Sequence, residues 1–226
     1  GLGDEWLRIG GLKLFADGAL GPQTAHMLAP YEGMAGNLGI PTLSREELHE
    51  LVGRANGAGL SVAIHAIGDA ANRTALDAIA AAQAATPDRM RPTLPNRIEH
   101  VQLLHADDLP RLAQLGVVAS MQPIHATSDM EMAGRHWGQR CELAYAWQSV
   151  LDSGARLAFG SDAPVETMDP LAGIHAAVTR RRADGSPGPE GWIPAQRISG
   201  AQAVYAYTLG AAHASGEAHL KGSLAP

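Results

Sequence analysis

Four residues whose side chains can bind a metal or move a proton occupy comparable places in the sequence. Each lies within, or just after, a short apolar run: Lys13, His65, His100 and Asp162. Two imidazoles, a carboxylate and an amine form a donor set suited to Zn²⁺, Mn²⁺ or Fe²⁺. Taken singly, each has a simpler explanation, because a strand histidine is usually a core residue, a lysine can extend to solvent and an aspartate can cap a turn. Their shared placement favours one common metal site.

The apolar runs themselves predict buried parallel strands. They are short, rich in Val, Ile and Leu, and each is followed by a polar residue and a loop. The predicted strands cover residues 12–16, 61–66, 97–101, 116–121 and 156–160.

Helical patterns fill the intervals between these strands. Capping signals begin three of them, at Ser44, at Asp169-Pro170 and at Ser199. The predicted helices cover residues 44–55, 69–85, 109–115, 141–153, 171–182 and 199–209. Strand–helix alternation indicates an α/β fold built from βαβ units around a parallel sheet. In a β/α barrel the carboxyl ends of the strands converge on one face, so the four candidate residues are expected to share one pocket.

The composition limits the class of protein. With 226 residues, 46% of them hydrophobic and 18% charged, the chain can bury a substantial core. A net charge of −6 argues against a nucleic-acid partner, and no apolar run reaches the roughly 20 residues that cross a bilayer. The single cysteine, Cys141, excludes an internal disulfide and favours a reducing compartment, so a cytoplasmic location is predicted. The composition is compatible with a homo-oligomer.

Five motifs occur in a fixed order along the chain. They are GLKLFADGALG at 11–21, VAIHAIGD at 62–69, RIEH at 97–100, SMQP at 120–123 and GSDAP at 160–164. They resemble strands four to eight of amidohydrolase family 3, the group of metal-dependent hydrolases that contains N-substituted formamide deformylase-like enzymes. The resemblance implies a (β/α)₈ TIM-type barrel, of which residues 1–226 form a partial domain with about strands 4–8 and C-terminal helices. Strands 1–3 and a small β-sandwich are expected to lie outside the chain.

The resemblance also implies roles for the candidate residues. His65 and His100 would ligate one of one or two divalent ions, with Zn²⁺ favoured, and Asp162 would contact a metal and the attacking water. Lys13 corresponds to a lysine that is carboxylated and bridges both ions in two-metal members. An unmodified ammonium beside a dication would be repelled, which agrees with that chemistry.

Five further residues have weaker claims. Gln122, His125 and Asp69 are predicted to contact the substrate, although Gln122 and Asp69 could instead support the ligands and His125 could be an exposed loop residue. Asp17 is expected either to orient Lys13 or to cap its turn. Glu99 is expected to point away from His100 and to form an ion pair or a packing contact.

The resemblance implies a metal-dependent hydrolase that cleaves a C–N bond, of amide or N-formyl type, in a small-molecule substrate. An ester or lactone hydrolase on the same barrel is one alternative. The other is a non-catalytic barrel fragment that binds a ligand or partner. The family's first strand ends in a His-x-His pair, and no such pair occurs in this sequence. The chain alone is therefore expected to be inactive and part of a larger molecule, with two open sheet edges.

Overall fold

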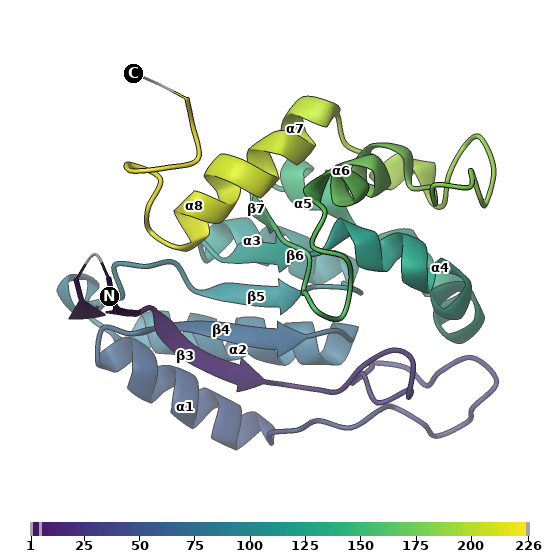
Figure 1. The fold of residues 1–226 in the computed structure, drawn as a ribbon. Coiled ribbons are helices and arrows are strands. Elements are labelled where there is room, and N and C mark those ends of the chain that lie inside the picture. The colour runs from purple at the N-terminus through teal and green to yellow at the C-terminus, as the bar shows by residue number, and fades with distance from the viewer. Residues whose placement is uncertain (1, 5, 225–226) are drawn as a thin grey trace.

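A parallel sheet forms the centre of the computed structural model, which describes residues 2–4 and 6–224 (Figure 1). In this part of the chain its strands lie in sequence order: β3 (Gly11–Phe15), β4 (Ser61–Ala66), β5 (Arg97–His100), β6 (Val118–Met121) and β7 (Arg156–Phe159). A short antiparallel pair, β1 (Leu2–Gly3) and β2 (Arg8–Ile9), precedes it. All five predicted strands are confirmed, with ends displaced by at most two residues. The α/β class and the arrangement of a partial TIM barrel follow from this order.

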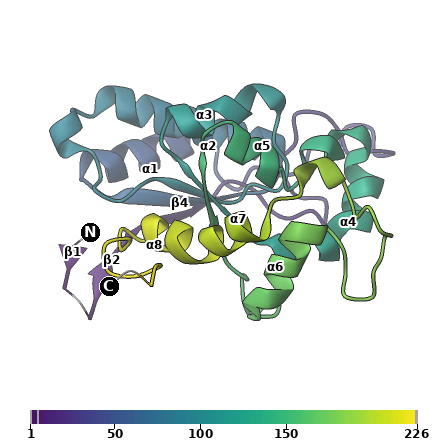
Figure 2. The same ribbon diagram turned by 90° about the horizontal axis from the view of Figure 1, so that it is seen from above.

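Helices connect the strands and cover the sheet. They are α1 (Arg45–Gly57), α2 (Asp69–Ala85), α3 (Leu109–Gln114), α4 (Pro123–Trp137), α5 (Trp147–Asp152), α6 (Pro170–Thr179), α7 (Gly200–Tyr205) and α8 (Ala211–Ala214). Short 3₁₀-helices occur at η1 (Asp88–Met90), η2 (Ala106–Asp108), η3 (Gly138–Leu143) and η4 (Pro194–Gln196), and a π-turn, η5 (Ala206–Gly210), joins α7 to α8. Figure 2 shows α1, α2 and α3 on one side of the sheet and α7 and α8 on the other. Among the described residues, no helix has the length and apolarity to cross a membrane.

One predicted helical region is divided in the structure, and one observed helix was not predicted. Residues 141–153 form η3 and α5 rather than one helix, because Tyr145 between them has a left-handed backbone with φ of 50°. Helix α4 was not predicted; its first residue, Pro123, directly follows Gln122. Proline is well suited to the first turn of a helix, because the backbone N–H it lacks would have no partner there.

The two faces of the sheet differ in character. One row of residues in register, Leu14, Ile64, Ile98, Ala119 and Leu157, is buried. The next row in register is Phe15, His65, Glu99, Ser120 and Ala158, and it lies on the opposite face. The apolar row packs toward the helices, and the mixed row faces what would be the barrel interior.

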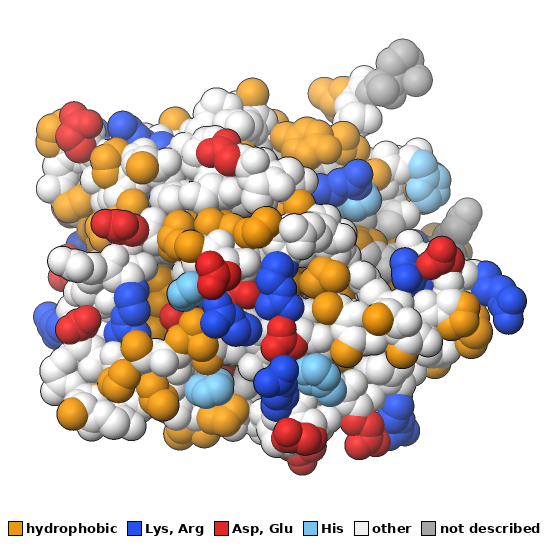
Figure 3. All heavy atoms as spheres, turned by 180° about the vertical axis from the view of Figure 1, so that it is seen from behind, with side chains coloured by type: hydrophobic (Ala, Val, Ile, Leu, Met, Phe, Trp, Pro, Cys, Tyr) orange, Lys and Arg blue, Asp and Glu red, His pale blue; other side chains and the backbone are white. Residues whose placement is uncertain are grey.

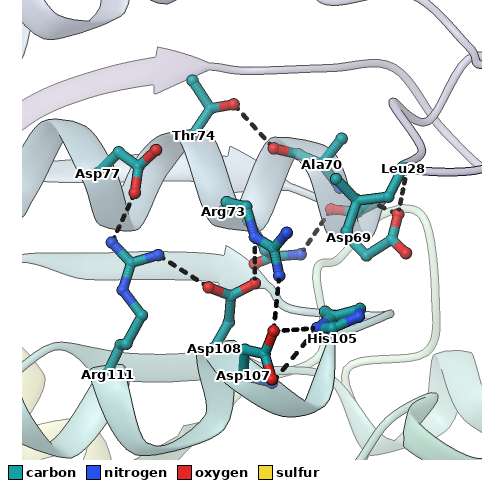
Figure 4. Close-up of polar contacts among 12 residues, drawn as sticks. Leu28, Asp69, Ala70, Arg73, Thr74, Asp77, His105, Asp107, Asp108 and Arg111 are labelled. Atoms are coloured by element: carbon teal, nitrogen blue, oxygen red, sulfur yellow. Dashed lines mark hydrogen bonds and ion pairs between the residues drawn. The ribbon is translucent and has the colours of Figure 1, made fainter.

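Ion pairs link the helices that cover the apolar face. Asp77 on α2 accepts hydrogen bonds from Arg111 on α3 (2.6 Å) and Arg45 on α1 (3.1 Å). The Asp108 side chain is 2% exposed and accepts from Arg73 and Arg111 (2.9 and 2.8 Å; Figure 4). Basic and acidic side chains are interspersed in the view from behind (Figure 3). These contacts hold α1, α2 and α3 in fixed relation above the sheet.

The segment between β3 and α1, residues 16–44 and called here the β3–α1 loop, is long and largely exposed, but a few buried contacts anchor it. Tyr31 is buried and its hydroxyl donates to the Ala25 carbonyl (2.8 Å). Arg140 of η3 donates to the carbonyls of Ala29 and Pro30 (2.7 Å each). These bonds anchor the loop to η3, and the loop lies on the side of the molecule toward which the strands point (Figure 1).

Arg180, at the end of α6, is a fully buried cation. Its guanidinium lies 4.5 and 4.9 Å from the ring centroids of Trp147 and Trp192. It donates to the carbonyls of Tyr145 (2.8 Å), Ala144 (3.3 Å) and Trp192 (2.6 Å). Burial lowers its pKa to about 9. The side chain thus ties three separate segments together by hydrogen bonds and cation–π contacts.

Replacement of this residue, Arg180→Met, is expected to lower the free energy of unfolding by about 2–4 kcal/mol, because buried carbonyls lose their donors. Urea denaturation measures the change. The matched control is Arg135→Met on α4, whose side chain is exposed and whose loss should change stability by less than about 0.5 kcal/mol. Equal effects of the two substitutions would contradict the role given to Arg180.

Candidate metal centre

Three potential ligands meet at the carboxyl edge of the sheet. One ring nitrogen each from His100 and His125 and one carboxylate oxygen from Asp162 lie within 4.8 Å of one another. Their elements are the end of β5, the first turn of α4 and the loop after β7. The His125 Nε2 lies 3.2 Å from the Asp162 Oδ2. Parallel strands that end on one edge explain why residues so distant in sequence come together.

His65 and Lys13 lie beside this cluster. The rings of His65 and His100 are in edge contact, with centroids 4.6 Å apart. The Lys13 Nζ is 4.9 Å from the centroid of Phe15, whose ring is 5.2 Å from that of His65. Burial lowers the pKa of Lys13, while the negative charges of Glu99 and Asp162 act in the opposite direction. His65 and His100 are thus in contact at the carboxyl edge, whereas Lys13, in the middle of β3, reaches this region through Phe15.

Left-handed backbone conformations turn two of the side chains into the site. His100 has φ of 76° and Asp162 has φ of 59°. Strict alternation would place His100, in register with Ala66, on the apolar face with Ile98. The left-handed residue at the strand end instead brings its ring against His65. Such conformations cost of order 1–3 kcal/mol each and concentrate at functional sites.

Glu99 corrects one expectation and confirms another. Its register with His65 places it on the same face as His65 and Lys13, so it does not point away from the site. The expected ion pair is present, since the Arg97 Nε donates to the Glu99 Oε1 (2.5 Å). Glu99 therefore adds a carboxylate to the face of the sheet that carries His65 and Lys13.

Hydrogen bonds set which ring nitrogen of each strand histidine is free. The His65 Nε2 lies 2.8 Å from the Gly18 carbonyl, which can only accept, so Nδ1 keeps its lone pair. The His100 Nδ1 lies 2.9 Å from the Gln122 Oε1, so Nε2 is the free nitrogen there. Burial lowers the pKa of His65, and burial together with the neighbouring His65 lowers the pKa of His100 to about 4. Both rings are neutral at physiological pH, as metal ligation requires.

Asp17 joins the β3–α1 loop to the turn before α2. Its Oδ2 accepts from the backbone N–H groups of His26 (2.9 Å) and Gly68 (2.8 Å), and its Oδ1 accepts from Ile67 (3.0 Å). The same Oδ1 is 3.5 Å from the His65 Nε2. Burial raises the pKa of Asp17 to about 7 against the lowering effect of the three N–H donors. The carboxylate therefore neither caps its own turn nor contacts Lys13, as was expected: it joins the β3–α1 loop to the turn before α2 and lies beside His65.

The three residues predicted to contact the substrate do not lie together in the structure. His125 lies within the cluster, and Gln122 supports His100. Asp69 instead faces the β3–α1 loop, where its Oδ1 accepts from the N–H groups of Leu28 (2.8 Å) and Ala70 (3.0 Å; Figure 4). In the described part of the chain, no hydrogen bond or ion pair joins Asp69 to the clustered rings. A substrate contact by Asp69 stays a prediction.

Two acidic residues of the site were missed from the sequence. Glu166 lies in the loop after β7, with its Oε1 3.7 Å from the His125 Nδ1. Asp129 lies one turn after His125 on α4 and accepts a hydrogen bond from the buried Tyr145 hydroxyl (2.5 Å). In each case the available signal was a carboxylate four residues after a residue already singled out, Asp162 or His125.

The chain is similar along its length to known proteins. A profile described as the amidohydrolase family matches residues 1–226. The chain is 40% identical over 224 residues to Protein LONG AFTER FAR-RED 3 of Arabidopsis thaliana, covering 98% of this chain and 37% of that protein. It is 29% identical to N-substituted formamide deformylase of Arthrobacter pascens, covering 96% and 39%. An uncharacterized metal-dependent hydrolase from Pyrococcus furiosus superposes with a TM-score of 0.82 at 35% identity, over 99% of this chain and 43% of the other. The chain thus spans about two fifths of the length of these relatives.

A substitution pair tests whether the Asp17 carboxylate holds the loop. Asp17→Asn is expected to lower the free energy of unfolding by about 1–3 kcal/mol, because the new NH₂ group would face an N–H donor. Asp69→Asn is the matched control: Asp69 accepts both of its bonds through one oxygen, which an amide retains. Urea denaturation of both variants measures the difference. Asp69→Asn as costly as Asp17→Asn would refute this account of Asp17.

Proposed function

We propose that the protein is a metal-dependent hydrolase that cleaves a C–N bond of amide or N-formyl type in a small molecule. The premise is that this chain belongs to the amidohydrolase family. The observation that carries the proposal is the convergence of His100, His125 and Asp162 at the carboxyl edge of the sheet, with the ring of His65 against that of His100. The similarity to N-substituted formamide deformylase supports a C–N bond as the target.

The residues fit one or two divalent ions, with Zn²⁺ favoured. Neutral imidazole nitrogens and a carboxylate oxygen are the donors that zinc takes in catalytic sites. The free nitrogens are those left by the bonds of His65 to Gly18 and of His100 to Gln122. Partners of this kind orient a metal-binding histidine and fix its tautomer. A divalent ion held there supplies Lewis acidity for activating water and polarising a carbonyl.

Asp162 is positioned to transfer the proton. In this mechanism its carboxylate accepts a proton from the attacking water and returns it to the nitrogen of the leaving amine. The loop after β7 presents this carboxylate toward His125 and His100, so donor, acceptor and ligands share one edge.

The second part of the proposal is that Lys13 becomes a carbamate. Burial lowers its pKa, which favours the uncharged amine. That form reacts with carbon dioxide: the nitrogen bonds to the carbon, one proton leaves, and a carbamate anion results. The product offers two oxygen donors where the ammonium would repel a dication.

Substitutions at Asp162 and His100 distinguish the proposed proton carrier from a metal ligand. Asp162→Asn is expected to keep the fold and part of the metal, but to lower kcat/KM by about 10²–10⁴, because an amide cannot carry the proton. His100→Gln is expected to lower metal content itself, and the exposed Asp152→Asn serves as control. The assay is hydrolysis of a panel of N-formyl and N-acyl amines, with metal content measured for each variant.

Near-native turnover by Asp162→Asn with verified metal would exclude this role. A metal-loaded protein that hydrolyses esters or lactones, but no amide, would favour the first alternative. Metal binding without any turnover would favour a ligand-binding protein.

A further prediction concerns the proposed carbamate of Lys13. Metal-stripped protein given Zn²⁺ is expected to regain activity only when bicarbonate is also present, whereas Lys13→Gln should show no bicarbonate response. Full recovery of the unsubstituted protein in buffer free of carbon dioxide would contradict a carbamate and indicate an unmodified lysine.

A further inference from the structure

A cavity beside the start of α2, called here the α2 cavity, is separate from the candidate metal centre. It has a volume of about 550 Å³ and lies between the β3–α1 loop, the first turns of α2, the residues that follow β5, and η3. None of the candidate metal ligands lines it. Its walls include the side chains of Leu28, Leu104, Leu143, Asp69, Arg73 and Arg140.

The Asp69 carboxylate has one oxygen without a bonding partner in the part of the chain that the structure describes. Its Oδ1 accepts from the N–H groups of Leu28 (2.8 Å) and Ala70 (3.0 Å), and no hydrogen bond or ion pair reaches its Oδ2. Figure 4 shows the second oxygen turned away from Leu28. Asp69 is 5% exposed and lines the cavity. A carboxylate so far removed from water is costly unless a donor or a cation pairs with it.

The arginines that line the α2 cavity are already paired elsewhere. Arg73 lies four residues after Asp69, at the helical spacing where acidic and basic side chains usually pair. Its Nε instead donates to Asp108 (2.9 Å), and its Nη2 lies 4.0 Å from the Asp107 Oδ2. Arg140 donates to two carbonyls of the β3–α1 loop. Among the described residues no ion pair joins Asp69 to either arginine, so the charge that lacks a partner in this cavity is negative.

Leucine side chains form much of the remaining wall, which is mostly apolar. Leu104 is buried, Leu143 is half-buried, and Leu28 is 40% exposed. An apolar hollow with a few placed polar groups is the usual form of a small-molecule site. The ligand that matches both features carries a positively charged N–H donor on an apolar body. A primary ammonium has three such donors and no acceptor, so it suits a lone carboxylate oxygen.

We propose that the α2 cavity binds a primary amine in its ammonium form, with the nitrogen on the Asp69 Oδ2 and the hydrocarbon part against Leu28, Leu104 and Leu143. The proposed hydrolysis of a C–N bond releases an amine of this chemical class, which makes the cavity a second site for a product. That link rests on the proposed function, whereas amine binding itself does not.

The test is isothermal titration calorimetry of the metal-loaded protein, in the length in which it occurs naturally, with n-hexylamine at neutral pH. Asp69→Asn keeps an oxygen for Leu28 and Ala70 and replaces the unpaired oxygen by an NH₂ group. It is expected to weaken n-hexylamine binding by about 10–100-fold, because a charge-assisted bond is lost. The uncharged n-hexanol should bind Asp69→Asn and the unsubstituted protein alike.

Two further variants make the comparison specific. Asp107→Asn removes the same charge from a side chain that is 80% exposed and should bind n-hexylamine as the unsubstituted protein does. Leu28→Ala shortens the apolar wall and is expected to weaken n-hexylamine binding by about 3–10-fold.

Circular dichroism establishes that each variant is folded, and Leu28→Ala decides the matter if Asp69→Asn is not. Absence of n-hexylamine binding, or equal affinity in Asp69→Asn, Leu28→Ala and the unsubstituted protein, would overturn the proposal. Binding that is lost in Asp162→Asn but kept in Asp69→Asn would place the amine at the candidate metal centre and would overturn it as well. Binding that depends on Asp69, in a protein that hydrolyses none of the N-formyl and N-acyl amines, would support this site and contradict the proposed function.

Discussion

The register of the parallel strands is the constraint on which the site depends. Side chains alternate between the two faces of a strand, so a slip of one residue would exchange the buried and the site-facing sets. The apolar row through Leu14, Ile64 and Ile98 packs against the helices and therefore fixes the register. With that row buried, Lys13 and His65 must face the opposite side. The free energy that stabilises the fold is thus also what aligns the candidate ligands.

Alignment of the strands is not sufficient, and the loops complete the geometry. The Asp17 carboxylate gathers three backbone N–H groups from two segments, and Gln122 fixes the His100 ring. The packed β3–α1 loop carries Gly18, whose carbonyl fixes His65. Rigid supports of this kind explain how the left-handed residues His100 and Asp162 are maintained despite their conformational cost. The geometry of the candidate metal site therefore depends on the residues that contact its side chains and not only on those side chains themselves.

The sequence was informative where a single physical rule dominates. Buried strands follow from apolar runs, and the gathering of His65, His100 and Asp162 follows from the shared strand ends. The rule of alternation alone misplaces His100, because one left-handed residue redirects the ring.

The misses have equally local causes. Helix α4 was not predicted because polar residues such as Ser128 and Asp129 interrupt its apolar spacing. Glu166 could not be assigned, since its approach to His125 depends on the path of an irregular loop. Asp69 is diverted from the site by the Leu28 N–H, a donor that only the folded loop supplies, together with the N–H of its own neighbour Ala70.

The most direct measurement is anomalous X-ray diffraction at the zinc absorption edge from crystals of the metal-loaded protein. The account predicts an anomalous peak at the carboxyl edge of the sheet, about 2.0–2.2 Å from a nitrogen of His100 and an oxygen of Asp162. A zinc peak bound elsewhere, or none at all beside His100 and Asp162, would contradict the central claim that these strand ends form a metal centre.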